Sequence, residues 1–224
     1  MSKGKKFILN SFENVKSVIL KDKREICLKD EKEFSLLIIS SNGETLLNLP
    51  IQYPSFGYGG GSLFLSLSES YLVFAYYSGQ GDESFMLFEI RDGLEEIYGE
   101  DYFIGFLGDY CFSRNEKLLI QSLSFFFWED LDDEEIFKEI IEKDENGKLF
   151  FDFASINVLD IAKKVVNEHL IRVYFSDNWQ FKKDNRDEPF MLPQMINGSM
   201  LKISMPWGDE LLNLPLNETI IFSL

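Results

Sequence analysis

Short runs of apolar residues recur along the chain, and residues that favour turns separate each run from the next. The runs consist mainly of Phe, Tyr, Val, Ile and Leu, which suit half-buried or fully buried strands. Helical periodicity is nearly absent outside one segment, so the pattern predicts an all-β protein. Nine runs are predicted to be strands: Ser17–Leu20, Glu25–Leu28, Phe34–Ser40, Ser62–Leu67, Tyr71–Tyr77, Phe85–Ile90, Lys117–Leu123, Leu149–Ile156 and Ile171–Phe175.

The residues between these runs carry the chemistry of tight turns. A glycine follows Asn42, Asp92 and Asn146, and in each case an apolar run lies on either side. Glycine after Asn or Asp supplies the positive φ that a hairpin connection needs. Consecutive strands are therefore expected to pair as antiparallel hairpins.

One segment of the chain is repeated near the other end. Leu36–Ile51 aligns without gaps on Leu201–Leu216, and eight of the sixteen positions are identical. The shared core of the match is Leu-Leu-Asn-Leu-Pro, which occurs at Leu46–Pro50 and again at Leu211–Pro215. Such a match indicates two equivalent hairpins, although convergence of two strand ends is the competing explanation.

A second, looser repeat has an offset of 47 residues and places Leu65–Val73 on Phe112–Ile120. Leu20–Leu28 follows the same pattern of an apolar residue, a polar turn and an apolar strand, at an offset of 45. Hairpins then follow at Phe34–Pro50, Phe85–Tyr98, Leu149–Val166 and Leu201–Leu216. A repeating unit of about 45 residues with four short strands is typical of propeller blades.

The segment Phe112–Leu119, which reads Phe-Ser-Arg-Asn-Glu-Lys-Leu-Leu, resembles a phrase common in β-propeller repeats of the WD40-like kind. This resemblance implies a single β-propeller-like domain over residues 1–224. The domain would be a small array of about four four-stranded blades with one inserted helix. A twisted β-sandwich is the alternative architecture.

The expected insert covers residues 128–147 and interrupts the third repeat. Within it Ile136, Phe137, Ile140 and Ile141 recur at the spacing of one helical face. Acidic residues fill its first turn, where the helix dipole favours negative charge. The segment Glu129–Glu145 holds ten acidic residues and two lysines, so it is the most acidic part of the chain.

Composition and charge limit the classes of partner. The chain has 224 residues, 45% hydrophobic residues and a net charge of −16. Such a chain is long and apolar enough to bury a core, and its charge opposes binding to nucleic acid or to an anionic membrane. No apolar run approaches the ~18 residues that span a bilayer. With neither a signal peptide pattern nor a cysteine framework, we expect a cytoplasmic protein.

The candidates for catalytic or metal chemistry all have simpler explanations. The single histidine, His169, has no recognisable nucleophile motif with it. The glycine-rich stretch Gly57–Gly61 runs into a strand instead of the helix that a phosphate loop requires. Asp144–Lys148 lacks the spaced ligands of a calcium loop and reads as a hairpin turn. Cys27 and Cys111 lie in strand-like runs and are expected to be buried, unreactive thiols. We therefore expect no catalytic residue, cofactor or metal.

The first functional hypothesis is a non-catalytic protein-interaction domain. Strong negative charge accelerates encounter with a basic protein, and a bacterial immunity-type protein that neutralises a basic toxin would have this charge and size. The contact is expected in the acidic insert, through Trp128, Glu129, Asp130, Asp132, Asp133, Glu134, Glu135 and Glu139.

The alternative is a module that binds a sugar or another small ligand, or a glycosidase-like enzyme, at the mouth of a propeller. Tyr76, Tyr77, Trp179 and Trp207 are the aromatic residues that would stack on sugar rings. Ser40–Thr45 is similar to the Asp-box of sialidase-like propellers, with Asn42 where the motif has Asp. This hypothesis requires the aromatic residues to meet in one pocket together with carboxylates.

Overall fold

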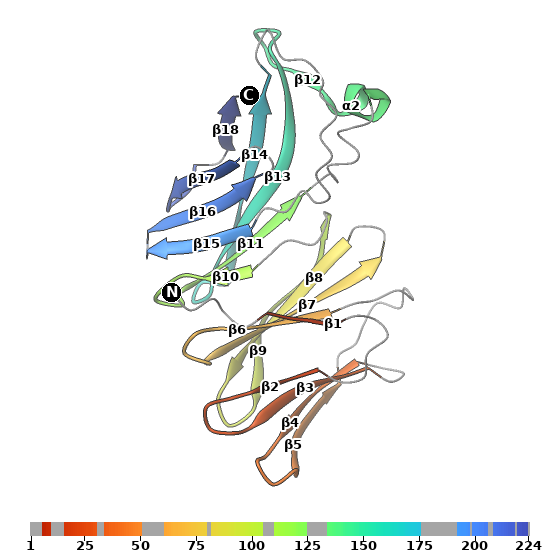
Figure 1. The fold of residues 1–224 in the computed structure, drawn as a ribbon, viewed down its shortest axis with the longest axis vertical. Helices are drawn as coiled ribbons and strands as arrows, with labels where there is room; N and C mark the ends of the chain where they lie inside the picture. Colours follow the sequence, from red (N-terminus) through yellow and green to blue (C-terminus); the bar gives the residue numbers. More distant parts are fainter. Residues whose placement is uncertain are drawn as a thin grey trace. The chain divides into compact units, whose positions relative to one another are not determined.

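The computed structural model describes residues 6–9, 16–30, 34–50, 61–79, 82–104, 110–124, 134–175, 192–197, 199–205, 208–217 and 219–223. In these residues the chain forms four β-sheets and a single helix, which confirms the predicted all-β class (Figure 1). The chain divides into two compact units, Met1–Phe103 and Ile104–Leu224, called unit 1 and unit 2 below. No helix in the described residues is long and apolar enough to cross a membrane.

Unit 1 contains two antiparallel sheets. Sheet B is an uninterrupted meander in the order β2-β3-β4-β5, and sheet A has the order β1-β6-β7-β8-β9, so that β1 is added beside a second meander. The strands of sheet B are β2 (Lys16–Ile19), β3 (Glu25–Asp30), β4 (Phe34–Ile39) and β5 (Thr45–Pro50). Those of sheet A are β1 (Lys6–Leu9), β6 (Gly61–Leu65), β7 (Tyr71–Gly79), β8 (Asp82–Ile90) and β9 (Leu94–Ile104).

The two sheets of unit 1 share one hydrophobic core. Alternate residues of sheet B, including Ile26 and Ile38, pack in the same cluster as Leu63 and Phe74 of sheet A. The opposite face of sheet A is also apolar, since neighbouring residues Val73 and Phe74 are both fully buried. Sheet A thus carries buried side chains on both faces, whereas a sheet exposed on one side alternates apolar and polar residues.

Unit 2 contains the other two sheets. Sheet C has the order β10-β11-β13-β14-β18, with the short β12 paired to β13, and sheet D has the order β15-β16-β17. The strands of sheet C are β10 (Tyr110–Phe112), β11 (Leu118–Ser124), β12 (Glu142–Lys143), β13 (Leu149–Asp160), β14 (Val165–Tyr174) and β18 (Thr219–Ser223). Those of sheet D are β15 (Leu192–Asn197), β16 (Met200–Met205) and β17 (Gly208–Asn213).

The core of unit 2 again joins two sheets. Phe151, Phe153 and Ile171 of sheet C pack in one cluster with Leu201 and Ile203 of sheet D. The Phe151 ring stacks on Phe175 with centroids 5.4 Å apart and meets Phe153 edge-on at 6.1 Å. Every pair in sheet C is antiparallel except β14 with β18, which is parallel.

The β6–β7 and β10–β11 turns, which the second repeat aligns, have matching hydrogen bonds. In the β6–β7 turn, the Ser66 amide donates to the main-chain oxygen of Tyr71, and Glu69 has a φ of 65°. In the β10–β11 turn, Ser113 and Leu118 are bonded in the same way, and Glu116 has a φ of 54°. The serine hydroxyl accepts from the amide at the far end of the turn in both cases, at 3.1 and 3.0 Å. These turns are therefore copies of one four-residue connection.

The β2–β3 turn is one residue shorter than this pattern. Here Leu20 bonds to Arg24, and Lys23 has the positive φ of 70°. The same three-residue connection closes β4–β5 at Ser40–Glu44 and β12–β13 at Asp144–Lys148, with Gly43 and Gly147 in the left-handed position. A type I turn followed by a left-handed residue is a common hairpin connection of this length.

Both segments of the first repeat form antiparallel hairpins, β4–β5 and β16–β17, and the two hairpins have different registers. In β4–β5, Leu36 lies opposite Leu49, whereas in β16–β17 its counterpart Leu201 lies opposite Leu212. In the sequence alignment Leu49 corresponds to Leu214. The strand pairing in β16–β17 is therefore shifted by two residues relative to the pairing in β4–β5. Side chains alternate with a period of two, so this slip leaves every residue on its original face. Leu46 and Leu211 are accordingly both exposed, and Leu36 and Leu201 are both buried.

All nine predicted strands coincide with observed strands, with shifted ends. Ser66 and Leu67, assigned to a strand from the sequence, belong to the β6–β7 turn because Ser66 closes it. β13 continues four residues beyond the predicted end, to Asp160. The sequence also favours a loop over Gln180–Pro193, but Pro193 lies in β15. It pairs with Ile203 at the edge of sheet D, where proline is tolerated.

Candidate functional site

The predicted acidic helix is present between β11 and β13 as α2, Glu134–Ile140 (Figure 1). Its first turn begins with Glu134 and Glu135, and Lys138 lies in its last turn, so both ends suit the helix dipole. Ile140 and the following Ile141 are partly buried and pack against the core of unit 2. Of the four apolar residues predicted to share one helical face, these two pack as expected, and the side chains of Ile136 and Phe137 lie outside the described residues.

The charged side chains of α2 point away from this core. Glu135, Lys138 and Glu139 are all exposed. Glu135 and Glu139 are four residues apart, so they are neighbours on one helix surface, where like charges destabilise a helix by ~0.2–0.5 kcal/mol. Of the other residues predicted to contact a partner, Trp128, Glu129, Asp130, Asp132 and Asp133 lie outside the described residues, as does the side chain of Glu134.

The helix leads into the β12–β13 hairpin, whose turn is formed by Asp144–Lys148. The Asp144 carboxylate accepts main-chain hydrogen bonds from Asn146 at 2.9 Å and Lys148 at 2.8 Å. Gly147 takes a φ of 79° with nothing near the position of a Cβ atom. The carboxylate that a calcium loop would use is thus engaged by its own turn, which confirms the hairpin interpretation.

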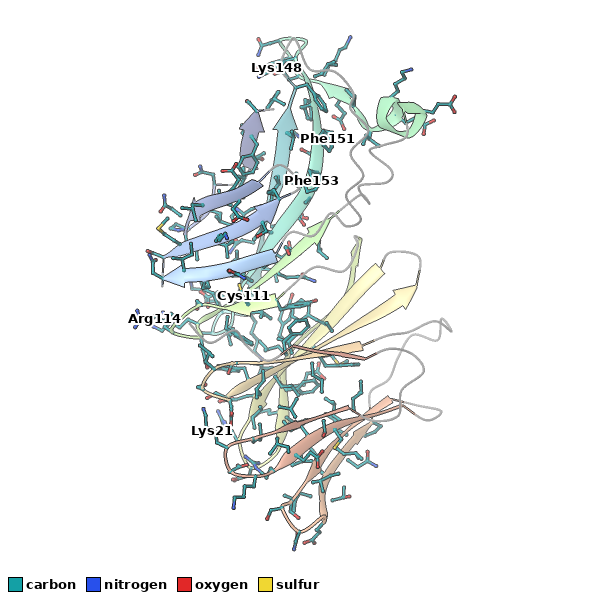
Figure 2. All side chains as sticks on the ribbon, viewed as in Figure 1. Lys21, Cys111, Arg114, Lys148, Phe151 and Phe153 are labelled. Atoms are coloured by element: carbon teal, nitrogen blue, oxygen red, sulfur yellow. The ribbon has the colours of Figure 1, made fainter. Side chains whose placement is uncertain are left out.

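A ladder of charged and aromatic side chains follows this hairpin on one face of sheet C. Lys148 Nζ lies 4.7 Å from the Tyr174 ring centre, and Phe150 packs against Tyr174 at 5.5 Å. The Arg172 guanidinium lies 3.9 Å from the Phe150 ring centre and donates two hydrogen bonds to Asp152, of 2.8 and 2.9 Å. Figure 2 shows Lys148 at the end of the hairpin.

Arg172 and Asp152 form a bidentate ion pair within this ladder. The hydrogen bond from Arg172 to Asp152 raises the pKa of the guanidinium above its ordinary value, so it is charged at every accessible pH. Both side chains are about a quarter exposed, at 27% and 26%, so the pair is partly shielded from water. Arginine stacked on a ring with a bidentate carboxylate is held in one orientation, which lysine cannot reproduce. Sequence patterns do not reveal this ladder because it depends on the β13–β14 register.

A row of polar side chains is buried further along the same face. Gln121 donates to the Tyr110 hydroxyl at 2.7 Å and accepts from the Asn157 amide at 3.2 Å. These three residues lie side by side because Tyr110 pairs with Gln121 and Gln121 pairs with Asn157. Ser155 Oγ and Asn157 Oδ1 are buried without a hydrogen-bond partner. Buried polar groups normally have partners, so these two atoms are exceptions.

The histidine and cysteine residues have structural surroundings. His169 Nδ1 is 2.5 Å from the main-chain oxygen of Asn217, a bond that fastens β14 to the segment before β18. Both cysteines are free. Burial raises the pKa of the Cys27 thiol to about 11, which keeps it protonated and unreactive at neutral pH. Cys27 is buried as expected, and Cys111 is half-buried. The described residues contain no group of His, Cys, Asp and Glu that could hold a metal ion.

The aromatic side chains that the sugar hypothesis requires lie outside the described residues. Trp179, Trp207 and the side chains of Tyr76 and Tyr77 are not described, and neither are Gly57–Gly60. Ser40–Thr45 forms the β4–β5 turn, in which Ser40 and Asn42 hydrogen-bond to each other and Ser40 Oγ accepts from the Glu44 amide. No protein-family model matches this chain, and no curated protein matches it either.

Proposed function

We propose that the protein is a non-catalytic interaction module that binds a basic protein through its acidic insert. The observation that carries the proposal is the two-sided character of α2. Ile140 and Ile141 hold it against the core of unit 2, and Glu135 and Glu139 remain exposed. The insert therefore holds its negative charges in a fixed position on unit 2, whereas an unattached acidic loop would not.

The charge pattern supports a partner of opposite sign. Glu135 and Glu139 are neighbours on α2, and their mutual repulsion opposes the helix. These glutamates would favour association, because a concentrated negative surface attracts a positive partner and raises its association rate. A small acidic protein that neutralises a basic toxin, as immunity-type proteins do, is the analogy that fits this charge and size.

The experiment compares two double variants with the same net charge. Glu135→Lys with Glu139→Lys alters the insert, and Glu44→Lys with Glu168→Lys alters two exposed glutamates on other strands and turns. The probe is a ten-residue lysine peptide in low salt, followed by any basic protein captured from the native cell. The insert variant is expected to bind the probe about tenfold more weakly, a loss of ~1.4 kcal/mol. Equal loss in both variants would show only a net-charge effect and would overturn the proposal.

We further propose that the sheets are blades of a small β-propeller-like array. Sheet B, the β6–β9 part of sheet A, and β10, β11, β13 and β14 of sheet C are each a four-stranded antiparallel meander. The matching turns at Ser66 and Ser113 and the double-sided burial of sheet A support this arrangement. A crystal structure with the four sheets around one axis would bear it out, and two separate sandwiches would reject it.

A further inference from the structure

The ends of the sheets differ in how they are protected from pairing with other chains. Terminal strands expose unpaired main-chain groups, and natural proteins protect them with charged residues, proline or shortness. Charged residues occur in β1, β2, β9 and β17, proline occurs in β5 and β15, and β10 has only three residues. In the described part of the chain, these strands account for seven of the eight sheet ends.

The remaining end, β18, has none of these protections. Its sequence is Thr-Ile-Ile-Phe-Ser, five residues without charge, proline or glycine. It pairs with β14 on one side only and is the last strand of sheet C among the described strands. Ile220 is buried in the core of unit 2, whereas Ile221 is 60% exposed. An uncharged strand of high β-propensity with an open edge is a template for another strand.

A groove lies beside this strand. It has a volume of about 490 Å³ and is lined by β18, by the end of β17 and by the segment that connects them. Leu211, Leu216 and Ile221 supply apolar surface, and Asn213 and Thr219 supply polar groups. None of the nine described residues that line it carries a charge. This neutrality is unusual for unit 2, which has 22 acidic and 12 basic residues and a net charge of −10.

We propose that the open edge of β18 and the groove beside it bind an extended peptide segment of a partner protein by strand addition. In this mode main-chain hydrogen bonds provide affinity, and alternate side chains enter pockets and provide specificity. The chain already adds one strand here, because β18 itself joins β14 in parallel outside the antiparallel meander. The occupant would continue sheet C by one further strand.

The lining and the charge of the chain define the occupant. Residues that face the groove should be aliphatic, to cover Leu211 and Leu216, because a charged residue would lose its hydration there without a partner. The remaining residues should be neutral or basic, because unit 2 is negative. A second copy of the chain is disfavoured as occupant, since two molecules of net charge −16 repel each other. The site does not depend on the acidic insert.

A displayed library of random twelve-residue peptides tests the proposal. The full chain is the bait. Peptides that also bind the Ile221→Lys variant are removed, because a lysine at an open strand edge blocks strand addition. Val165→Lys is the matched control, since Val165 is 49% exposed on β14 and lies outside the groove. Enriched peptides should alternate aliphatic with neutral or basic residues. These peptides should bind the Ile221→Lys variant about tenfold more weakly than the Val165→Lys variant. Bound peptide should also slow amide hydrogen exchange in β18.

Three results would overturn the proposal. The first is that no peptide survives counter-selection, and the second is that surviving peptides leave exchange in β18 unchanged. The third is that the original chain sediments as a dimer and the Ile221→Lys variant as a monomer, which would show that a second copy of the chain occupies the edge. Circular dichroism of both variants confirms that each is folded. The Glu135→Lys, Glu139→Lys variant should bind these peptides normally, so failure of the acidic-insert proposal is distinguishable from failure of this one.

Discussion

Glu69 accepts a 2.7 Å hydrogen bond from the main-chain amide of Lys21, which is 48 residues earlier in the chain. Lys21 Nζ in turn donates to the carbonyl oxygen of Leu67 at 3.1 Å. A third contact nearby runs from Arg24 to the carbonyl oxygen of Arg91, at 2.7 Å. These bonds connect the β2–β3, β6–β7 and β8–β9 turns, so they fasten the two sheets of unit 1 to each other at one end.

We expect Glu69→Asn to weaken this connection. Asparagine tolerates the positive φ of this position but is too short to reach the Lys21 amide. Loss of the bond should lower the free energy of unfolding by about 1 kcal/mol in urea denaturation. Lys23→Asn, at the exposed positive-φ position of the β2–β3 turn, controls for the effect of asparagine on such a turn. An equal effect of both substitutions would mean that the bond to Lys21 contributes nothing.

Gly147→Ala should destabilise the β12–β13 hairpin. Gly147 has a φ of 79° and open space where a Cβ would lie, so the cost comes from backbone conformation alone. A left-handed conformation costs a residue with a Cβ about 1–2 kcal/mol. Gly93→Ala is the control, because Gly93 also has open space but no positive φ. Thermal unfolding should separate the two variants, and similar melting temperatures would contradict the explanation.

Ser155→Ala should maintain or raise stability, although Ser155 is fully buried. Its hydroxyl has no hydrogen-bond partner, and a buried unsatisfied group costs about 1–3 kcal/mol. The alanine variant removes that group and leaves only a small void. Urea denaturation of the variant provides the measurement. A loss of more than 1 kcal/mol would instead indicate an ordered water molecule bound to Ser155 and Asn157.

The sequence was sufficient to predict most strands and the hairpin turns, but not β12, β15 or the strands added to the edges of sheets A and C. Alternating apolar residues and turn glycines are local signals, so the nine predicted strands and the helix near Ile140 agree with the structure. β1 and β18 were missed because their pairing is determined by distant partners, Gly61–Phe64 and Leu170–Tyr174. The Arg172–Phe150 contact was missed for the same reason. The open edge of β18 can be recognised only when the order of strands is known.

The stability contributed by Asp209 should depend on pH. Its hydrogen bonds from Lys202 and then Ser204 hold the pKa of the carboxyl below its usual 3.8. A depressed folded-state pKa stabilises the fold above the unfolded value, and this contribution is lost as the pH falls through the folded pKa. Asp209→Asn should therefore be less stable than the original chain at pH 7, and the difference should disappear in acid. A constant difference down to pH 2 would contradict this assignment.

Cys27 should react with a thiol reagent only after unfolding. Its pKa of about 11 leaves almost no thiolate at pH 8, and its side chain is only 3% exposed. Cys111 is half-buried and should be labelled faster in the native protein. The raised pKa of Cys27 also affects the free energy of unfolding, which should fall as the pH rises from the ordinary thiol value of 9.0 towards 11. Mass spectrometry of the labelled peptides provides the measurement, and rapid native labelling of Cys27 would contradict it.

The two-residue slip between the β4–β5 and β16–β17 hairpins has a consequence for how these loops can change in length. A change of one residue in register would expose the core positions of a whole strand, whereas a change of two preserves them. Insertions and deletions at such hairpins are therefore tolerated in even steps, and a duplicated hairpin can diverge at its tip while its inner face stays constant. Hairpin tips that differ in length by two residues should therefore be exchangeable without disturbing the core, with Leu36 and Leu201 as fixed points of the design.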